Sequence, residues 1–348
     1  MFEELIRSWD GEFVVTHFDT ESGTWIFICI HSTTRGPAGG GTRMRTYATP
    51  ADGLEDATRL AGAMTLKMAA VDIPCGGGKA VLATPGTLDE PTRRGLLLRY
   101  GRLVDSLGGT YRTGPDVNTT IADMDVIGER TPYVFCRSTE HGGSGDPGPY
   151  TARGVFHGIR ASVRHVFGSD DLAGRSVLVQ GVGDVGARLA EQLAEAGARV
   201  LVADVDDQRA RDLAGRIGGE VIDPGAVTTY ECDVYAPCAL GGTLNAESIP
   251  ELRCRIVAGC ANNQLNEPDD AARLRDAGIL YAPDFVINSG GVLHAWGKEM
   301  LGWSPEVVEE RHAGIGDALT AIYERAEADG ITTAEAAEQI ARSRLESD

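Results

Sequence analysis

The pattern of apolar and polar positions predicts different structures in the two halves of the chain. In the first half, residues 13–16 and 25–30 are rich in β-branched and aromatic side chains and are separated by the turn-prone Glu21-Ser22-Gly23, which predicts a β-hairpin. From Pro50 onward, apolar residues recur at helical spacing and predict a helix with Lys67 near its end. Glycine-rich loops follow this helix.

The second half begins after a dense cluster of chain-breaking residues at 141–149, which we take as a domain boundary. Short apolar strands then alternate with helical patterns, at 177–179, 199–202, 234–235, 256–258 and 279–281. This alternation is typical of a parallel sheet with crossover helices. Near the end, Thr332 and Glu335 form a predicted capping box that opens the last helix. The expected fold class is therefore α/β, with two domains.

Size and charge narrow the possible functions. The 348 residues exceed the size at which one core usually keeps growing. No apolar run approaches the roughly 20 residues of a membrane helix, and Met1 to Asp10 lack the features of a secretory signal, so we expect a cytoplasmic protein. A net charge of -19 makes nucleic acid and anionic membranes unlikely partners. The seven cysteines contain no CxxC pair, so we expect neither a disulfide framework nor a metal site.

The strongest motif is a glycine-rich turn between a strand and a helix. It follows the GxGxxG pattern that holds a dinucleotide pyrophosphate at a helix N-terminus, and its residues are Gly181, Val182, Gly183, Asp184, Val185 and Gly186. Asp204 ends the next strand, where a carboxylate can accept hydrogen bonds from a ribose diol. Together with Asp206 and Asp207 it would repel a 2′-phosphate, which predicts NAD rather than NADP as the cofactor.

Candidate chemistry lies in the first half. Lys67 and Lys79 occupy apolar or glycine-rich surroundings, although few residues of the chain are lysine. A desolvated lysine tends to have a lowered pKa and can act as a base. Asp116 is flanked by glycine, proline and valine. Taken singly, each lysine could be a solvated surface charge and Asp116 could stabilise a turn.

These residues lie within a series of ordered motifs. These motifs are the segments 36–41, 64–67, 76–79, 114–118, 181–186, 232–239, 258–264, 281–284 and 288–291. Through these segments, the chain resembles the glutamate/leucine/phenylalanine/valine dehydrogenase family along nearly its whole length, and within the family it is most similar to the phenylalanine branch. Ser289 departs from the family pattern, in which alanine is commoner.

The resemblance implies an NAD-dependent L-amino-acid dehydrogenase that releases a 2-oxo acid and ammonia. Lys67 would bind the substrate carboxylate, Lys79 would activate water as a base, and Asp116 would relay protons. The implied organisation is a substrate domain at 1–148, a Rossmann-type NAD domain at 149–325 and a C-terminal helix at 326–348 that returns to the first domain. The family also implies a homo-oligomer of unspecified size.

The resemblance places further binding residues in both halves. Asn262 would hold the nicotinamide ribose or the substrate, Asn288 would lie near the reacting amine, and Thr151 would contact the cofactor. The glutamate-specific lysine and serine of the family are replaced here, which predicts that glutamate is rejected. The residues expected around the substrate side chain are mostly small: Gly39 with its neighbour Gly40, Gly114, Val292 and Ala295.

A pocket lined by such small residues predicts an aromatic substrate, L-phenylalanine first. The alternatives are tryptophan, or leucine and valine if neighbours such as Leu293 or Trp296 shrink the pocket. Two other classes stay open: a catalytically silent cofactor-sensing protein, and a 2-hydroxy-acid dehydrogenase. The latter would need a histidine paired with a carboxylate, and only His294 falls near a motif.

Overall fold

The structure is a computed structural model that describes residues 5–7 and 9–346, and it divides into two compact units. Unit 1 is made of 1–146, 298–302 and 341–348, and unit 2 of 147–297 and 303–340. The first four residues, on which the expected cellular location partly rests, lie outside the described residues. Among the described residues, no helix is both long and apolar enough to cross a membrane.

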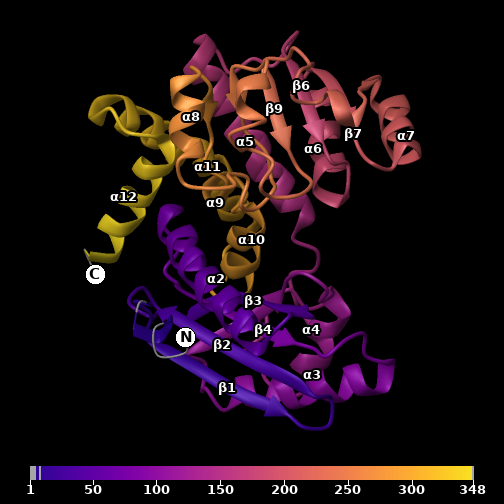
Figure 1. Cartoon of the computed structure of the whole chain (residues 1–348), viewed down its shortest axis with the longest axis vertical. Coiled ribbons are helices and arrows are strands. Elements are labelled where there is room, and N and C mark those ends of the chain that lie inside the picture. The colour runs from indigo at the N-terminus through magenta and orange to yellow at the C-terminus, as the bar shows by residue number, and fades with distance from the viewer. Residues whose placement is uncertain (1–4, 8, 347–348) are drawn as a thin grey trace. The chain divides into compact units, whose positions relative to one another are not determined.

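Unit 1 is built around a mixed sheet of five strands (Figure 1). Its elements are β1 (Phe13–Asp19), β2 (Thr24–Ser32), β3 (Ala38–Arg45), α2 (Pro50–Ala70), β4 (Gly76–Ala83), α3 (Glu90–Asp105), β5 (Tyr111–Pro115), α4 (Ile121–Gly128) and a 3-10 turn, η1 (Thr139–His141). The strand order is β1-β2-β4-β3-β5. The predicted hairpin is confirmed as β1 and β2, which pair antiparallel, whereas β3 runs parallel to both β4 and β5.

The sheet of unit 1 is covered on both faces because its central strands are apolar on both sides. Phe27 and Cys29 of β2 join a core cluster with α2, while the alternating Ile26 and Ile28 join a second cluster with α3 and α4. Helix α2 starts at Pro50 as the sequence predicts, since Thr49 caps it and forms a capping box with Asp52 in its first turn. The helix therefore fixes one face of the sheet and carries Lys67 in its last turn.

Unit 2 contains a six-stranded sheet in which every pair of strands is parallel. Its first elements are α5 (Gly148–Phe167), β6 (Ser176–Gln180), α6 (Asp184–Glu195), β7 (Arg199–Ala203), α7 (Asp207–Ile217), β8 (Glu220–Val221), η2 (Pro224–Ala226) and β9 (Val234–Pro237). They are followed by η3 (Ile249–Glu251), β10 (Ile256–Val257), α8 (Asp270–Asp276), β11 (Leu280–Tyr281) and α9 (Asp284–Ile287). The order β11-β10-β9-β6-β7-β8 is Rossmann-like, which confirms the predicted two-domain α/β class.

Three helices end the chain: α10 (Gly290–Glu299), α11 (Pro305–Asp329) and α12 (Thr333–Glu346). The predicted capping box before α12 is confirmed, since Thr332 N donates to Glu335 Oε2 at 2.7 Å and Glu335 N donates to Thr332 Oγ1 at 3.1 Å. Within 326–348, residues up to 340 group with unit 2 and the remainder with unit 1. There, Arg344 donates to the carbonyls of Ala69 and Ala70, both at 2.8 Å.

Candidate active site

Lys79 lies in the middle of β4, between β2 and β3 of unit 1. The glycines before it let neighbouring elements approach closely: a Cβ on Gly77 would lie 2.1 Å from Thr65 N of α2, and one on Gly40 would lie 1.7 Å from Gly78 O. The Lys79 side chain is only 6% exposed. A charged lysine in such a position needs a partner or a lowered pKa.

The partner of Lys79 is Asp116, which follows β5 directly. Lys79 Nζ lies 3.1 Å from Asp116 Oδ2, and Arg43 Nε of β3 donates to the same oxygen at 2.8 Å. The Arg43 guanidinium also donates from Nη1 to Asp56 Oδ2 of α2 at 2.9 Å. The hydroxyl of Tyr47 donates to that oxygen of Asp56 at 2.7 Å. The exposed Arg59 also pairs with Asp56, at 2.9 Å, so three cations and two carboxylates alternate in one largely buried network.

Sequence reasoning placed Lys79 and Asp116 in the site but missed Arg43 and Asp56. One signal could have found Arg43: it lies two residues after Gly41, so both point to the same side of β3. A Cβ on Gly41 would lie 2.9 Å from the Asp116 Cβ, so glycine is needed there for Asp116 to pack. No comparable local pattern singles out Asp56.

The network shifts the pKa of its members in ways suited to proton transfer. Burial lowers the pKa of Lys79, and the nearby Arg43 lowers it further, although Asp116 opposes both effects. Burial alone would raise the pKa of Asp116, but Lys79 and Arg43 more than offset it and hold this carboxyl below its ordinary value. The arrangement favours an ionised Asp116 beside a lysine that loses its proton more easily than usual.

The loop after β5 fixes Asp116. Thr119 Oγ1 accepts from Asp116 N at 2.9 Å and donates to Thr42 O of β3 at 2.7 Å. Asn118 has a left-handed backbone, with φ of 59°, and its side-chain amide donates to Met44 O at 3.1 Å. These contacts tie the loop to β3, so the Asp116 carboxylate is positioned by backbone as well as by its ion pairs.

The other predicted residues of unit 1 have different surroundings. Lys67 is half-buried near the end of α2, and Gly39 and Gly40 are buried in β3. Gly114 lies in β5, and a Cβ there would lie 2.1 Å from the ring of Phe135. The ring of Phe135, a residue only 7% exposed, therefore fills the space next to Gly114.

In unit 2 the glycine motif joins β6 to α6. Gly181 has φ of 91°, and a Cβ on Gly186 would lie 2.0 Å from Gly181 O, so both positions require glycine. Gly183 is exposed, a Cβ there would meet nothing within 4 Å, and it begins α6 without a side-chain cap. This leaves room and backbone N–H groups for a phosphate, so the residues present fit a dinucleotide.

The carboxylates after β7 differ in their partners. Asp204 has a side chain only 7% exposed and accepts from Val182 N of the glycine motif at 2.7 Å. Asp206 caps α7 and lies 3.2 Å from Arg209, while Asp207 forms an ion pair with Arg211. Arg209 Nη1 also lies 3.9 Å from Asp204 Oδ1, so each of the three carboxylates expected to repel a 2′-phosphate has an arginine nearby, and Asp204 is the least exposed of them.

Unit 2 also brings together two predicted binding residues from separate loops. Asn288 Nδ2 donates to Asn262 Oδ1 at 2.8 Å and lies 3.2 Å from Cys260 O. Thr151 lies on α5, and a Cβ on Gly291 would lie 2.6 Å from its Oγ1. Within α10, Val292 is half-buried and Ala295 is buried.

His294 has the surroundings of a core histidine. It is buried in α10, and its ring stacks on Tyr150 with centroids 3.3 Å apart. This environment gives no support to a hydroxy-acid dehydrogenase, which would need a histidine beside a carboxylate. Within the described residues, no cluster of histidine, cysteine and carboxylate groups could hold a metal ion.

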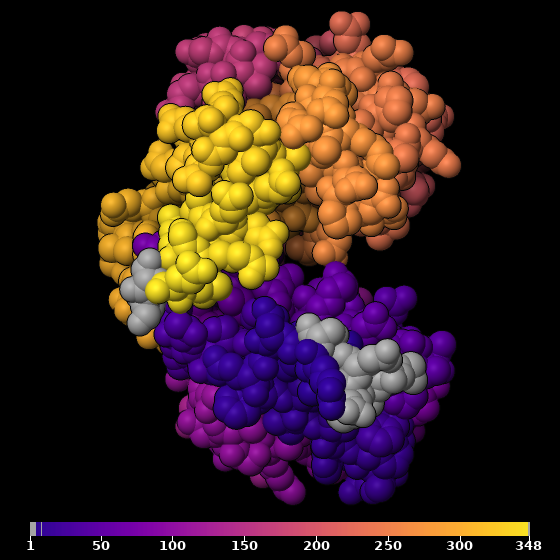
Figure 2. Space-filling model, turned by 60° about the vertical axis from the view of Figure 1, so that its left-hand side comes forward, coloured from indigo at the N-terminus to yellow at the C-terminus, as the bar shows by residue number. Residues whose placement is uncertain are grey.

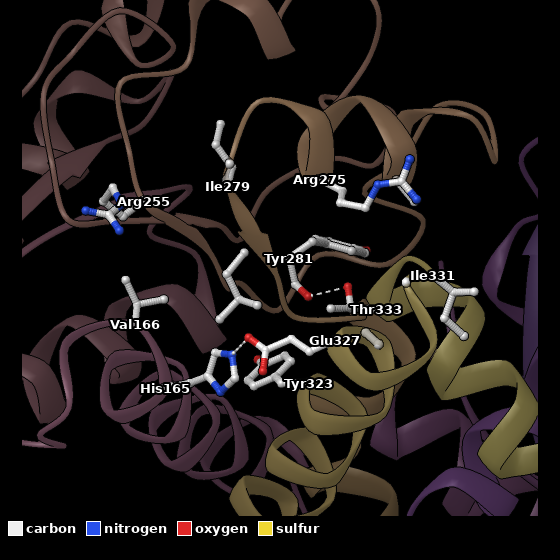
Figure 3. Close-up of a pocket in the computed structure, with 15 residues that line it drawn as sticks. His165, Val166, Arg255, Arg275, Ile279, Tyr281, Tyr323, Glu327, Ile331 and Thr333 are labelled. Atoms are coloured by element: carbon white, nitrogen blue, oxygen red, sulfur yellow. Dashed lines mark hydrogen bonds and ion pairs between the residues drawn. The ribbon is translucent and has the colours of Figure 1, made fainter.

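A cavity of about 420 Å³ lies elsewhere in unit 2 (Figure 3). Its walls come from α5, α8, β11, α11 and the start of α12, and Figure 2 shows part of this face, where the yellow C-terminal segment adjoins the orange one. His165 and Glu327 pair across it at 3.0 Å, and Thr333 Oγ1 donates to Tyr281 O at 2.7 Å. None of the candidate site residues lines this cavity.

Comparison with known proteins identifies the chain as an NAD(P)-dependent L-amino-acid dehydrogenase that carries out oxidative deamination. Two sequence models match the chain: "Glu/Leu/Phe/Val dehydrogenase, dimerisation domain" at residues 15–133, and "Glutamate/Leucine/Phenylalanine/Valine dehydrogenase" at 142–210 and 202–347. The chain belongs to this family.

Several relatives match along nearly their whole length. A leucine dehydrogenase of Thermoactinomyces intermedius is 42% identical over 99% of this chain and 93% of its own. A valine dehydrogenase of Streptomyces albus is 44% identical over 96% and 92%. The L-tryptophan dehydrogenase of Nostoc punctiforme is 44% identical over 98% and 95%. Its crystal structure has a TM-score of 0.86 at 39% identity and covers 100% of this chain and 99% of that one.

These comparisons correct one expectation. The relatives are named for leucine, valine and tryptophan, so the expected likeness to the phenylalanine branch is not supported. The family and the reaction class are unaffected.

Proposed function

We propose that this enzyme is an NAD-dependent dehydrogenase of non-polar L-amino acids, with leucine and valine as its best substrates. The observation that carries the reaction is the buried ion pair of Lys79 and Asp116, at 3.1 Å, beside glycine-rich strands. A lysine whose pKa is lowered by burial, held against an ionised carboxylate, suits proton transfer better than a purely structural salt bridge does. The dimerisation-domain match supports a homo-oligomer.

The roles of the unit 1 residues follow from their chemistry. We assign the substrate carboxylate to Lys67, whose ammonium can pair with it. Lys79 takes a proton from the water that attacks the imino carbon, since burial eases loss of its own proton. Asp116, held ionised, moves protons to and from the amine and the carbinolamine, which then collapses to the 2-oxo acid and ammonia. NAD, when bound, supplies the hydride acceptor.

The proposed coenzyme residues are those of unit 2. The glycine motif from Gly181 to Gly186 would hold the pyrophosphate. Asp204 would accept hydrogen bonds from the adenosine ribose hydroxyls, using lone pairs that are not occupied by Val182 N. Asn262 and Asn288 would orient the nicotinamide half and the substrate amine, and Thr151 would contact the coenzyme. The Asp204 carboxylate supports NAD over NADP because it would face a 2′-phosphate there, although Arg209 Nη1 lies 3.9 Å from it and offsets part of its charge.

The proposed substrate side chain is aliphatic. Gly39 and Ala295 stand where glutamate-specific members have a lysine and a serine, so a distal carboxylate would find no partner from either. Among the small residues of unit 1 proposed to contact the substrate side chain, Gly114 is covered by the Phe135 ring. A narrower wall at β5 favours leucine or valine over a larger ring, in agreement with the names of several relatives.

Tryptophan is the second candidate. Gly39 adds no side chain to the pocket, and the tryptophan dehydrogenase of Nostoc punctiforme matches this chain along its whole length. Phe135→Leu distinguishes the candidates: if the ring narrows the pocket, this variant should improve kcat/KM on tryptophan relative to leucine by about 10-fold, the value of one or two methylenes in a pocket. An unchanged ratio would remove Phe135 from the pocket.

The test of function is a panel of kinetic assays in both directions. Oxidation of NADH is measured with ammonia and the 2-oxo acids of leucine, valine, phenylalanine, tryptophan and glutamate, and reduction of NAD with the matching L-amino acids. We expect leucine or valine to lead and glutamate to be weakest. A clear lead for tryptophan would select the second candidate, and no ammonia-dependent turnover with any of them would overturn the proposal.

A further inference from the structure

Two pairs of cysteines flank neighbouring strands of unit 2. Val234 and Tyr235 of β9 pair with Ile256 and Val257 of β10, each 22 positions later. The same spacing separates Cys232 from Cys254, just before the two strands, and Cys238 from Cys260, just after them, where Cys260 Sγ lies 3.9 Å from Cys238 O. Adjacent strands lie about 4.8 Å apart, within the range of Cα separations that a disulfide bridges.

The two pairs have different environments. Cys232 and Cys254 are buried, and burial raises the pKa of each thiol to about 12. Cys238 and Cys260 are partly exposed, and Cys260 Sγ lies 3.9 Å from Cys238 O. A hydrogen bond from the Cys260 side chain lowers the pKa of Cys238, and the same contact raises the pKa of Cys260. The partly exposed pair thus places a thiol of lowered pKa beside a second thiol.

The exposed pair also touches the residues proposed to bind the coenzyme. A Cβ on Gly186 would lie 3.3 Å from Cys238 Cβ, and a Cβ on Gly181 would lie 2.8 Å from Ala239 N. On the other side, Asn288 Nδ2 lies 3.2 Å from the carbonyl of Cys260. The carboxyl ends of parallel strands are where dinucleotides bind in this class of sheet. A change at either sulfur therefore acts directly on the glycine motif and on Asn288.

We propose that hydrogen peroxide oxidises Cys238 and Cys260 to a reversible disulfide between them, and that this disulfide blocks binding of the coenzyme. The Cys238 thiolate attacks one oxygen of hydrogen peroxide, the O–O bond breaks, and a sulfenic acid and hydroxide form. The Cys260 sulfur then attacks the Cys238 sulfur, the S–O bond breaks, and water leaves with the Cys260 proton. In sum, two thiols and one peroxide give one disulfide and two waters.

The block follows from packing. A covalent bond fixes the two sulfurs about 2.05 Å apart and fixes both side-chain torsions, which ties the segments after β9 and β10 to each other. Gly181 and Gly186 pack tightly against the segment after β9, and Asn288 donates a hydrogen bond to Cys260 O in the segment after β10. If the disulfide weakens coenzyme binding, bound coenzyme must oppose disulfide formation to the same extent, because the two equilibria are linked.

The first experiment uses the unmodified full chain. The protein is treated with hydrogen peroxide with and without NAD, its free thiols are alkylated, and peptides are mapped by mass spectrometry. We expect a Cys238–Cys260 disulfide, free thiols at Cys232 and Cys254, and protection by NAD. Titration with NAD should show a Kd raised about 10-fold or more in the oxidised protein and restored by dithiothreitol. Free Cys238 and Cys260 under conditions that oxidise other thiols would overturn the proposal.

Two variants complete the test. Cys260→Ser removes the second sulfur, so peroxide should leave a sulfenic acid on Cys238, trapped by dimedone, and no disulfide. Cys254→Ala alters the matched buried pair and should respond to peroxide as the unmodified chain does. Reversible loss of NAD binding in Cys260→Ser equal to that of the unmodified chain would contradict the mechanism. The inference rests on the proposed use of NAD, but peptide mapping reports the disulfide even if a different coenzyme binds.

Discussion

Arg43 allows a direct test of how the ion-pair network controls catalysis. We predict that Arg43→Met shifts the acid limb of the pH–rate profile to higher pH. Arg43 lies 2.8 Å from Asp116 and 2.9 Å from Asp56. Its loss removes one of two cations that hold the pKa of Asp116 down. It also removes a charge that lowers the pKa of Lys79. Both pKa values should therefore rise.

The size of the shift follows from the geometry. One unit charge at about 4 Å is worth about 4 kcal/mol at an effective dielectric constant of 20, and a carboxylate beside one arginine is typically shifted by about 1–3 pKa units. Asp116 keeps Lys79 after the substitution, so we expect a shift of about 1–2 units. The reaction needs ionised Asp116 and deprotonated Lys79. Asp116 stays ionised above about pH 6 even after this shift, so Lys79 sets the acid limb of kcat/KM, and loss of the Arg43 charge should move that limb to higher pH by about 1 unit or more.

The assay measures kcat/KM for the best amino acid between about pH 6 and pH 11, in steps of about 0.5 pH unit. Arg43→Lys is the matched control: it keeps the charge but loses the two-sided guanidinium contact, so its profile should move less. An acid limb at the original pH, with a lower plateau alone, would show that Arg43 supports the site only structurally and would refute the electrostatic reasoning.

Three further predictions concern other sites. Asp116→Asn should lower kcat by about 10²-fold or more because the amide cannot relay protons, whereas a change in KM alone would make Asp116 a binding residue. Asp204→Ala should reduce the preference for NAD over NADP measured as the ratio of kcat/KM values, and an unchanged ratio would place the discrimination elsewhere. Asp19→Asn should lower the free energy of unfolding at pH 7 by about 1–3 kcal/mol, because Asp19 accepts from Arg99 and Ser22. Burial alone would raise the pKa of Asp19, but its contacts with Arg99 and Ser22 hold this pKa below the unfolded value of about 3.9. In denaturant titrations, the loss of unfolding free energy in Asp19→Asn should therefore fade as the pH drops below that value. A loss that persists there would refute the charge effect.

Local patterns predicted the elements of the fold well. The β1–β2 hairpin, the parallel strands of unit 2 and the turn from Gly181 to Gly186 each depend on residues close together in sequence. Lys79 and Asp116 were found because their apolar and glycine-rich neighbours are unusual for charged residues. The structure adds that they are ion-paired at 3.1 Å.

Features that depend on long-range register escaped sequence reasoning. Arg43 resembles any surface arginine until β3 and β5 pair and bring it to Asp116. The ring of Phe135 covers Gly114 because its segment joins β5 by backbone hydrogen bonds, which composition does not reveal. The arginine partners of Asp206 and Asp207 belong to the same category, since a run of carboxylates alone suggests more uncompensated charge than is present.

The most direct test of the central claim compares Lys79→Ala with Lys298→Ala, a substitution at an exposed lysine outside the site. Ammonia-dependent NADH oxidation with the preferred 2-oxo acid and NAD binding are measured for both variants and the unmodified chain. The proposed role of Lys79 predicts that Lys79→Ala loses turnover by about 10²–10⁴-fold while NAD binding persists, and that Lys298→Ala keeps both. Near-normal turnover in Lys79→Ala would contradict the role of Lys79 as the base.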